Sequence, residues 1–296
     1  MPTDVTAPVN LVDTGSPFDG TTKTAFNLLE AGLMTKKTPI HFCVDRVIPM
    51  DHKVNAAALA MKVNPKNAPK ALPRLPGVST NPVKISFFVG KQWKKGQTLR
   101  VTFLDGSPTQ RRRVQRKAVE WLDYANLKFV FKQSTQAEIR ISFKADPGSW
   151  SAIGTDCLST DAFPKDEPTM NFGWLEDDTE DEEYRRVVVH EFGHALGAVH
   201  EHQVPKGGIQ WNLPAVYAYF SGPPNNWSKE DIDFNVIQKY SVDQLNGTRF
   251  DRQSIMLYRF PAQFILAPKS LASTGTNENT DLSTNDKKFV RKLYST

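Results

Sequence analysis

Three histidines lie within eleven consecutive residues, in the stretch HEFGHALGAVH that runs from His190 to His200. His190 and His194 are four residues apart, so a helix would place both side chains on one face, one turn apart. Gly197 can take a left-handed C-cap conformation, which would let the chain turn and bring in His200. Glu191 would lie beside an ion held by the three rings without being a ligand. Three protein nitrogens and one open position are typical of a catalytic zinc site.

The longer pattern HExxHxxGxxH resembles the signature of the metzincins, which also have a methionine-containing turn further along the chain. Residues 254–258 read SIMLY and closely resemble the SIMHY stretch of astacin-like peptidases. Glu201, directly after the third histidine, is also similar to astacins, whereas matrix metalloproteases usually have serine there and serralysins proline. The chain therefore resembles an astacin-like metzincin zinc metallopeptidase, and this resemblance covers roughly residues 97–296.

The sequence departs from typical astacins in three places, which indicates a divergent branch. After the third histidine it reads EHQVPKGGI instead of HExxRxDRD. Leu257 stands where the Met-turn usually has histidine, and the chain has two cysteines instead of four. We therefore carry over the chemistry of the family but not its substrate preference.

The resemblance implies a zinc-dependent endopeptidase with one catalytic Zn²⁺. The ion would lower the pKa of its water toward about 7 and polarise the peptide carbonyl. Glu191 would act as the general base and then protonate the leaving amine. By resemblance, Tyr258 binds zinc at rest and then stabilises the oxyanion, Met256 packs beneath the ion, and Glu201 anchors a processed N-terminus through a buried ion pair.

The N-terminal segment could silence such a site, because any anionic ligand can take the open position of the ion. Astacin-like enzymes are made as zymogens in which a pro-segment residue does this. The residues expected to mask the zinc here are Asp19, in PFDG, Cys43 and Asp45. The alternative is a structural extension that packs on the domain, with Cys43 buried or in a disulfide.

Two other functions stay open on sequence alone. The chain could be a zinc-stabilised peptide-binding or latent, self-masked module, although an intact Glu191 argues for hydrolysis, since binding needs no base. It could also hydrolyse a non-protein amide. His202 is predicted to be exposed and not to be a fourth ligand.

Composition and charge are those of an ordinary globular protein, with 39% hydrophobic and 23% charged residues and a net charge of +5. The one tight basic cluster, residues 111–113, is expected at the start of a helix that also carries glutamate. We interpret it as a solvated face, so no nucleic-acid partner is expected. Since no run of eighteen apolar residues exists, no membrane partner is expected either. The expected partner is a protein or peptide substrate in extended conformation, and the chain is predicted to be a monomer.

The compartment stays open. The first residues, MPTDVTAPVNLVDTG, show no basic segment followed by an apolar one, so no signal peptide is recognised. Cys43 and Cys157 are the two cysteines, and whether they pair cannot be read from the sequence. These features favour a cytoplasmic or non-classically exported chain. The resemblance to peptidases favours export, and the chain would be extracellular if Met1 is not its natural start.

The alternation of apolar residues predicts an α+β fold. Residues 99–103, 127–131 and 137–143 alternate like half-buried strands, and apolar residues recur at helical spacing over 114–125. Residues 169–175 are expected to form the edge strand near the cleft, where an extended peptide could pair. These elements would form a twisted mixed sheet with a backing helix, N-terminal to the active-site helix, as in a metzincin-type zincin. Thr179 and Glu182 are expected to cap that helix.

The remaining residues predict the domain organisation. Residues 1–93 read as an N-terminal extension and possible pro-segment, with short helices at 24–34 and 56–63, strands at 40–48 and 84–89, and a proline-rich linker at 64–82. Residues 94–296 would form the catalytic domain, with an upper subdomain at 94–197 and a lower one at 198–296. The lower part should be loop-rich and helical, with helices that begin near Asn212, Ser228 and Ser283.

Overall fold

The computed structural model describes residues 42–44, 46, 48–69, 90–145, 148–205, 208–223, 225–240 and 250–295. All of them belong to one compact unit, residues 40–296. The expected helix at 24–34, the strand at 84–89 and the two acids Asp19 and Asp45 lie outside the described residues. No described helix is long and apolar enough to cross a membrane.

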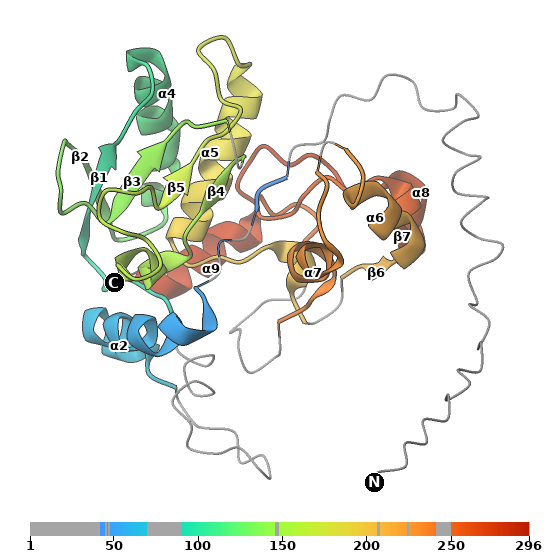
Figure 1. Cartoon of the computed structure of the whole chain (residues 1–296), viewed down its shortest axis with the longest axis horizontal. Coiled ribbons are helices and arrows are strands. Elements are labelled where there is room, and N and C mark those ends of the chain that lie inside the picture. Colours follow the sequence, from blue (N-terminus) through green and yellow to red (C-terminus); the bar gives the residue numbers. More distant parts are fainter. Residues whose placement is uncertain are drawn as a thin grey trace, which may run out of the picture. The chain divides into compact units, whose positions relative to one another are not determined.

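A five-stranded mixed sheet forms one half of the unit and confirms the predicted α+β class (Figure 1). The strand order is β2-β1-β3-β5-β4. Neighbouring strands are parallel except for β4, which pairs antiparallel with β5. The strands are β1 (Thr98–Phe103), β2 (Lys128–Phe131), β3 (Ile139–Ser142), β4 (Trp150–Ser151) and β5 (Met170–Asn171).

The position of the edge strand differs from the prediction. Residues 169–175 were expected at the edge, but β5 lies between β3 and β4, and β4 forms the edge. The expectation failed because β5 is flanked on both sides by strands that are short and distant in sequence. Its two residues are fully buried, which is the burial of an inner strand.

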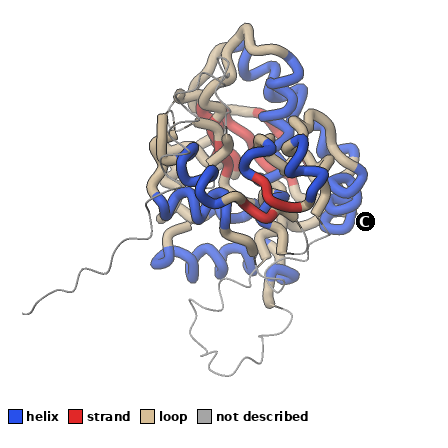
Figure 2. The backbone as a smooth tube through the Cα atoms, turned by 90° about the vertical axis from the view of Figure 1, so that its right-hand side faces the viewer, coloured by secondary structure: helices blue, strands red, loops and turns tan. Residues whose placement is uncertain are grey.

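Helices lie beside the strands of the sheet (Figure 2). The backing helix α4 (Pro108–Ala118) begins at a capping box of Ser107 and Gln110 and continues as the 3₁₀ turn η3 (Val119–Asp123). It packs against α5 (Asp181–Ala195), which is buried along almost its whole length. The predicted Thr179 cap of α5 is wrong: the N-cap residue is Glu180, and the Thr179 hydroxyl accepts a hydrogen bond from the amide of Glu176 instead.

The other half consists mainly of short helices and loops, as predicted (Figure 1). Ser228 and Asp231 form the expected capping box, as do Ser283 and Asp286. A small antiparallel pair joins β6 (Gln210–Trp211) to β7 (Ile265–Ala267). The helices are α6 (Leu213–Phe220), α7 (Lys229–Ile232), a π-helical turn η6 (Asp233–Ile237), α8 (Lys269–Thr274) and α9 (Thr284–Tyr294).

Each half has its own hydrophobic core. The larger core lies between the sheet, α4 and α5 and includes residues of α9. The smaller one gathers aromatic side chains around α6 and β7. The catalytic residues expected from the sequence lie at or next to the end of α5, where residues from both cores meet.

The N-terminal segment contributes α2 (Lys53–Val63), which confirms the predicted helix at 56–63. Its buried face packs against the 3₁₀ turn η4 (Gly154–Leu158). Beneath it, Lys91 pairs with Asp156, whose side chain is buried. Burial raises the pKa of Asp156, while the nearby ammonium of Lys91 acts to lower it. The described residues of the expected strand at 40–48 form no strand.

Candidate metal centre

The end of α5 positions the first two histidines. His190 and His194 lie one turn apart on this helix, and both are buried. The helix ends at Ala195 with Leu196 as its C-cap, and Gly197 follows with φ of 97°, the left-handed conformation predicted for it. The amide of Ala198 returns to the carbonyl of Gly193, which turns the chain so that His200 faces the helix.

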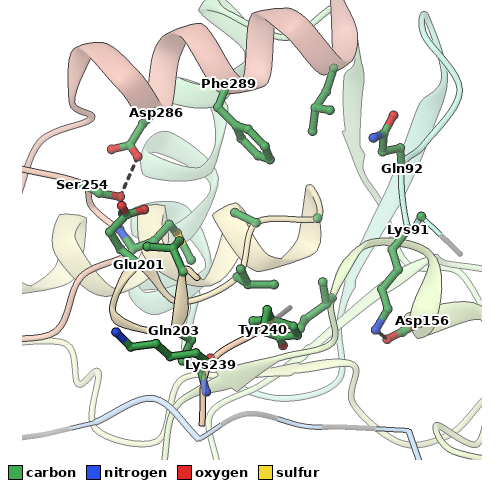
Figure 3. A pocket seen from close by; sticks show the side chains of 18 of the residues that line it. Lys91, Gln92, Asp156, Glu201, Gln203, Lys239, Tyr240, Ser254, Asp286 and Phe289 are labelled. Atoms are coloured by element: carbon green, nitrogen blue, oxygen red, sulfur yellow. Dashed lines mark hydrogen bonds and ion pairs between the residues drawn. The ribbon is translucent and has the colours of Figure 1, made fainter. Parts of the chain in front are cut away.

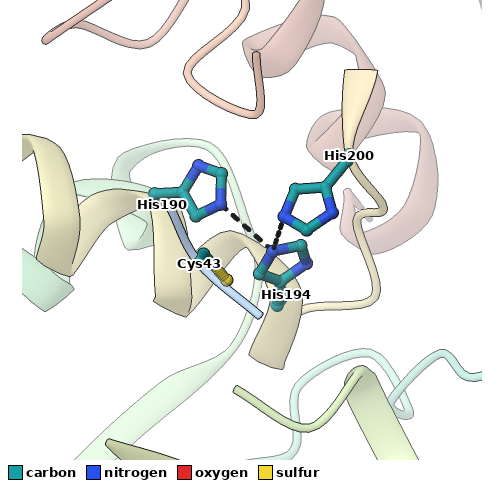
Figure 4. A group of neighbouring side chains, drawn as sticks. All are labelled: Cys43, His190, His194 and His200. Atoms are coloured by element: carbon teal, nitrogen blue, oxygen red, sulfur yellow. Dashed lines mark hydrogen bonds between the residues drawn. The ribbon is translucent and has the colours of Figure 1, made fainter. Parts of the chain in front are cut away.

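The three imidazoles converge on one point (Figure 4). The Nε2 atom of His194 lies 3.1 Å from that of His190 and 3.0 Å from that of His200. The Nδ1 atoms of His190 and His194 face the backbone carbonyls of Ile255 and Ala198 at 2.8 and 2.9 Å. Since a carbonyl only accepts, these Nδ1 atoms carry the protons, and the Nε2 lone pairs point at one another.

Such an arrangement needs a cation, because unprotonated Nε2 atoms cannot hydrogen-bond to each other. Burial and the two neighbouring imidazoles hold the pKa of His190 well below its usual value, so the ring stays neutral and able to act as a ligand. Two nitrogens bound to a tetrahedral zinc ion are about 3.3 Å apart. The observed separations are close to this value, and nitrogen and sulfur donors are those that zinc prefers.

A cysteine from the N-terminal segment lies at the same point. The Sγ atom of Cys43 and one ring nitrogen of each histidine all lie within 4.8 Å of one another, and all four residues are buried. The thiol also donates to the Oε2 atom of Glu191 at 3.3 Å. Neither Cys43 nor Cys157 is in a disulfide. Among the residues predicted to mask the ion, Cys43 is the one that the structure describes.

The Met-turn lies beneath the histidines and is held from α9. The carboxylate of Asp286 accepts hydrogen bonds from the Ser254 hydroxyl at 2.7 Å and the Ile255 amide at 2.9 Å. Ile255 in turn offers its carbonyl to His190. The Met256 side chain packs closely against Gly193 of α5: a Cβ atom built on this glycine would lie 2.5 Å from the methionine sulfur. A residue with a side chain does not fit there.

Tyr258 follows the Met-turn and faces the histidines. Its hydroxyl donates to the backbone carbonyl of Cys43 at 2.6 Å and is also in close contact with the Nε2 atom of His200. The tyrosine ring lies 4.3 Å from the His200 ring, measured between centroids. A phenol in this position can donate a hydrogen bond to the carbonyl of a peptide that crosses the centre.

Glu201 lies behind the centre, in the wall of a cavity of about 290 Å³ (Figure 3). Its side chain is 8% exposed and accepts a hydrogen bond from the Asp251 amide at 2.6 Å. Burial raises the pKa of this carboxyl to about 8. Residues of α2, including Lys53 and Ala60, also line the cavity.

His202 corrects one prediction. It was expected to be exposed, but it is completely buried, stacks on His200 and contacts the Asn235 carbonyl through its Nε2 atom at 3.0 Å. Sequence analysis also missed the contact of Asp286, a capping residue of α9, with the Met-turn. A capping acid that lies thirty residues after the Met-turn gives no local signal of a second contact.

The chain is similar to one protein family and to several solved structures. Residues 92–207 match the family model of matrixins, described as Peptidase_M10. Two solved structures of myroilysin are each 41% identical in sequence, with TM-scores of 0.65 and 0.54. The first match covers 70% of this chain and 96% of that protein, and the second covers 70% and 86%.

A third solved structure is High choriolytic enzyme 1, a hatching-enzyme zinc protease from the medaka fish Oryzias latipes. It is 18% identical and has a TM-score of 0.47, and the match covers 69% of this chain and 94% of that one. No curated protein matches significantly.

Proposed function

The chain belongs to the metzincin zinc metallopeptidases, and from this premise we propose that it is a zinc-dependent endopeptidase of the astacin-like branch, produced in a latent form. The observation that carries the proposal is the convergence of the three Nε2 atoms on one point. When bound, a single zinc ion would act as a Lewis acid on a water molecule and on the substrate carbonyl.

The remaining chemistry is assigned to two side chains. Glu191 would accept a proton from the attacking water and deliver it to the leaving nitrogen, and its 1% exposure keeps competing water away. Tyr258 would donate a hydrogen bond to the carbonyl oxygen as negative charge develops on it. The contact of its hydroxyl with the Cys43 carbonyl supports this role, because that carbonyl belongs to a peptide lying across the centre.

Substrates are proteins or peptides, and we assign them an extended conformation. The amide of Val44 donates to the carbonyl of Ser149, directly before the edge strand β4, at 3.1 Å. A main-chain hydrogen bond of this kind needs no particular side chain, so it suits a substrate that pairs with the edge of a sheet.

A metal analysis combined with a cleavage assay tests the function. Purified protein with Cys43 replaced by alanine should contain one equivalent of zinc and cleave casein, and a chelator should stop the cleavage. Glu191→Ala in the same background should keep the zinc and lose at least about 1,000-fold in rate, because only the base is removed. Zinc binding without any cleavage in the Cys43→Ala protein would favour a binding module instead.

Latency is assigned to Cys43. Its Sγ atom lies where a fourth ligand would lie and contacts Glu191, so it would exclude the attacking water and engage the base together. Asp19 and Asp45, the other two residues predicted for this role, stay alternatives outside the described part of the chain.

The two cysteines provide a matched test of latency. Cys43→Ala in the full chain should raise peptide hydrolysis by at least about tenfold over wild type, because a metal–thiolate bond no longer competes with substrate. Cys157→Ala is the control, since that thiol is equally buried but lies beside Asp156, in η4. Equal rates for wild type and Cys43→Ala would remove Cys43 from this role.

We assign Glu201 a role after activation, when the N-terminal segment has been cut. A buried carboxyl with a raised pKa in a cavity lined by α2 could pair with an amino group once the N-terminal segment is cut. After activation by proteolysis, Glu201→Gln should then lower the stability of the cleaved protein more than that of the full chain. Thermal unfolding of both forms measures this difference.

A further inference from the structure

Phe42 is buried in a cluster of aromatic rings next to the metal centre. Its side chain is 6% exposed. Its ring centroid lies 4.8 Å from that of Phe220, 5.5 Å from Tyr258 and 5.9 Å from Phe260. The Trp227 ring lies 6.4 Å away and stacks on Phe220. These separations are those of favourable aromatic pairs, so the site fits a planar apolar ring.

The walls of this aromatic site belong to the C-terminal half and not to the segment that carries Phe42. Phe220 ends α6, and Tyr258 and Phe260 follow the Met-turn. All three are part of the smaller hydrophobic core. If the N-terminal segment leaves, the rings that surround Phe42 stay in the protein and the volume of the phenylalanine side chain becomes a pocket.

Phe42 is adjacent to Cys43, and this determines where the pocket lies relative to the metal centre. Phe42 directly precedes Cys43, whose Sγ atom lies among the three histidines and whose carbonyl accepts from Tyr258. On the other side, the Val44 amide pairs with Ser149, and the Arg46 guanidinium lies 4.6 Å from the centre of the Trp150 ring. The segment thus crosses the centre as an extended peptide would, with one side chain inserted in the aromatic site.

We propose that Phe220, Trp227, Tyr258 and Phe260 form a specificity pocket that takes a large aromatic side chain from the substrate residue next to the scissile bond. Phe42 fills this pocket in the latent chain in the manner of a substrate. The inference rests on the proposed peptidase function and adds its substrate class, which is peptides with phenylalanine, tyrosine or tryptophan adjacent to the cleaved bond.

Cleavage profiling of a peptide mixture tests the pocket. The enzyme is the full chain with Phe42→Ala and Cys43→Ala, which empties both the pocket and the ligand position. Among the cleaved bonds, one flanking position should be enriched in aromatic residues, with kcat/KM at least about tenfold higher than for alanine at that position. Trp227→Ala should reduce this ratio about fivefold, because a half-buried wall of the pocket is lost.

Tyr219→Ala is the matched control for Trp227→Ala. Tyr219 is a half-buried aromatic residue of α6 whose ring contacts are with Phe220 and Phe264. The Tyr219→Ala substitution should leave unchanged the ratio of kcat/KM for substrates with an aromatic residue to kcat/KM for substrates with alanine at that position. Cleavage with no aromatic preference, or an equal loss of preference in both variants, would overturn the pocket while leaving the peptidase function intact. A complete absence of cleavage in the zinc-loaded protein would reject the peptidase function and the substrate pocket with it.

A second measurement does not depend on hydrolysis. In the zinc-loaded full chain, the rate of Cys43 alkylation by iodoacetamide reports how often the segment leaves the centre, and peptide mapping separates it from Cys157. Phe42→Ala should raise this rate about tenfold, since the ring no longer holds the segment. Val44→Ala, the control on the same segment, should change it less than about twofold. Equal rates for the two variants would show that the aromatic site does not bind the ring and would overturn the proposal.

Discussion

At the scale of single residues, the centre depends on which ring nitrogen of His190 and of His194 carries the proton. Two backbone carbonyls determine this, one from Ile255 and one from Ala198. The Ile255 carbonyl belongs to the Met-turn, so this turn orients His190 in addition to packing beneath the rings. Sequence motifs predict the three histidines as ligands, but backbone acceptors carry no side-chain signal, and this part of the centre could not be read from the sequence.

Tyr258→Phe tests the role of the phenol. We expect kcat in the Cys43→Ala background to fall about 100-fold with little change in KM, because one donor to the developing oxyanion is lost. Zinc content should stay at the level of the parent, as measured by elemental analysis. The control is Tyr217→Phe, which removes a hydroxyl that bonds Asp233 far along the C-terminal half. Loss of zinc in Tyr258→Phe would instead assign the tyrosine to metal binding.

His202 and Cys43 show where residue-level prediction succeeds and where it stops. The histidine spacing predicted that the three rings would converge, because the helix period and one glycine determine this locally. His202 follows in the same loop, yet its ring packs against Tyr258 and Phe260, and its Nε2 atom contacts the carbonyl of Asn235, all of them distant in the sequence. Cys43 could be named only as one of three residues, since its approach to the histidines depends on how the whole N-terminal segment packs.

At the scale of secondary-structure elements, α5 and the Met-turn are joined by the contact between Gly193 and Met256. Trp121 of η3 also approaches this glycine, so three elements meet at a position that admits no side chain. The sequence predicted the helix and the turn separately. It contained no sign of their close approach beyond the glycine itself, which lies in the interior of a helix where it lowers stability by about 1 kcal/mol relative to alanine.

Gly193→Ala should therefore destabilise the protein although alanine favours helices. We expect a loss of about 1–3 kcal/mol in the free energy of unfolding, because the new methyl group forces Met256 and Trp121 apart. Urea unfolding measures it. Adding Met256→Ala to the Gly193→Ala protein should lower the free energy of unfolding by less than Met256→Ala lowers it in wild type, since the clash disappears. If the effects of the two substitutions on the free energy of unfolding are additive, the two residues are not coupled.

The packing of α2 on η4 gives a prediction for pH. Burial raises the pKa of Asp156, so the folded chain keeps its proton at pH values above 3.8 where the unfolded chain has lost it. The wild-type protein should accordingly lose stability relative to Asp156→Asn as the pH rises from about 4, by at most about 1.4 kcal/mol per unit. Urea unfolding of both proteins from pH 4 to 7 measures this. A wild type that gains stability relative to the variant over this range would mean that Lys91 lowers the pKa instead.

At the scale of the whole molecule, the centre joins two stretches of chain that are far apart in sequence. Cys43 comes from the N-terminal segment, His190 and His194 from α5, and His200 from the loop that enters the C-terminal half. The predicted fold class was correct because alternation and helix period are local patterns. The inner position of β5 and the path of the N-terminal segment were beyond the sequence, because both depend on contacts between distant residues.

Removal of the metal should therefore loosen the N-terminal segment as well as stop hydrolysis. Without a cation, the lone pairs of the facing Nε2 atoms would repel one another, and Cys43 would lose its bond to the ion. We expect chelation to lower the melting temperature of the full chain by about 5–10 °C, which corresponds to roughly 3 kcal/mol. Limited trypsin digestion should then cut the chain within residues 42–69 at least about tenfold faster. In Cys43→Ala the acceleration should be much smaller, because the segment is already detached from the ion. An equal acceleration in both proteins would mean that the metal stabilises the two halves but does not hold the N-terminal segment.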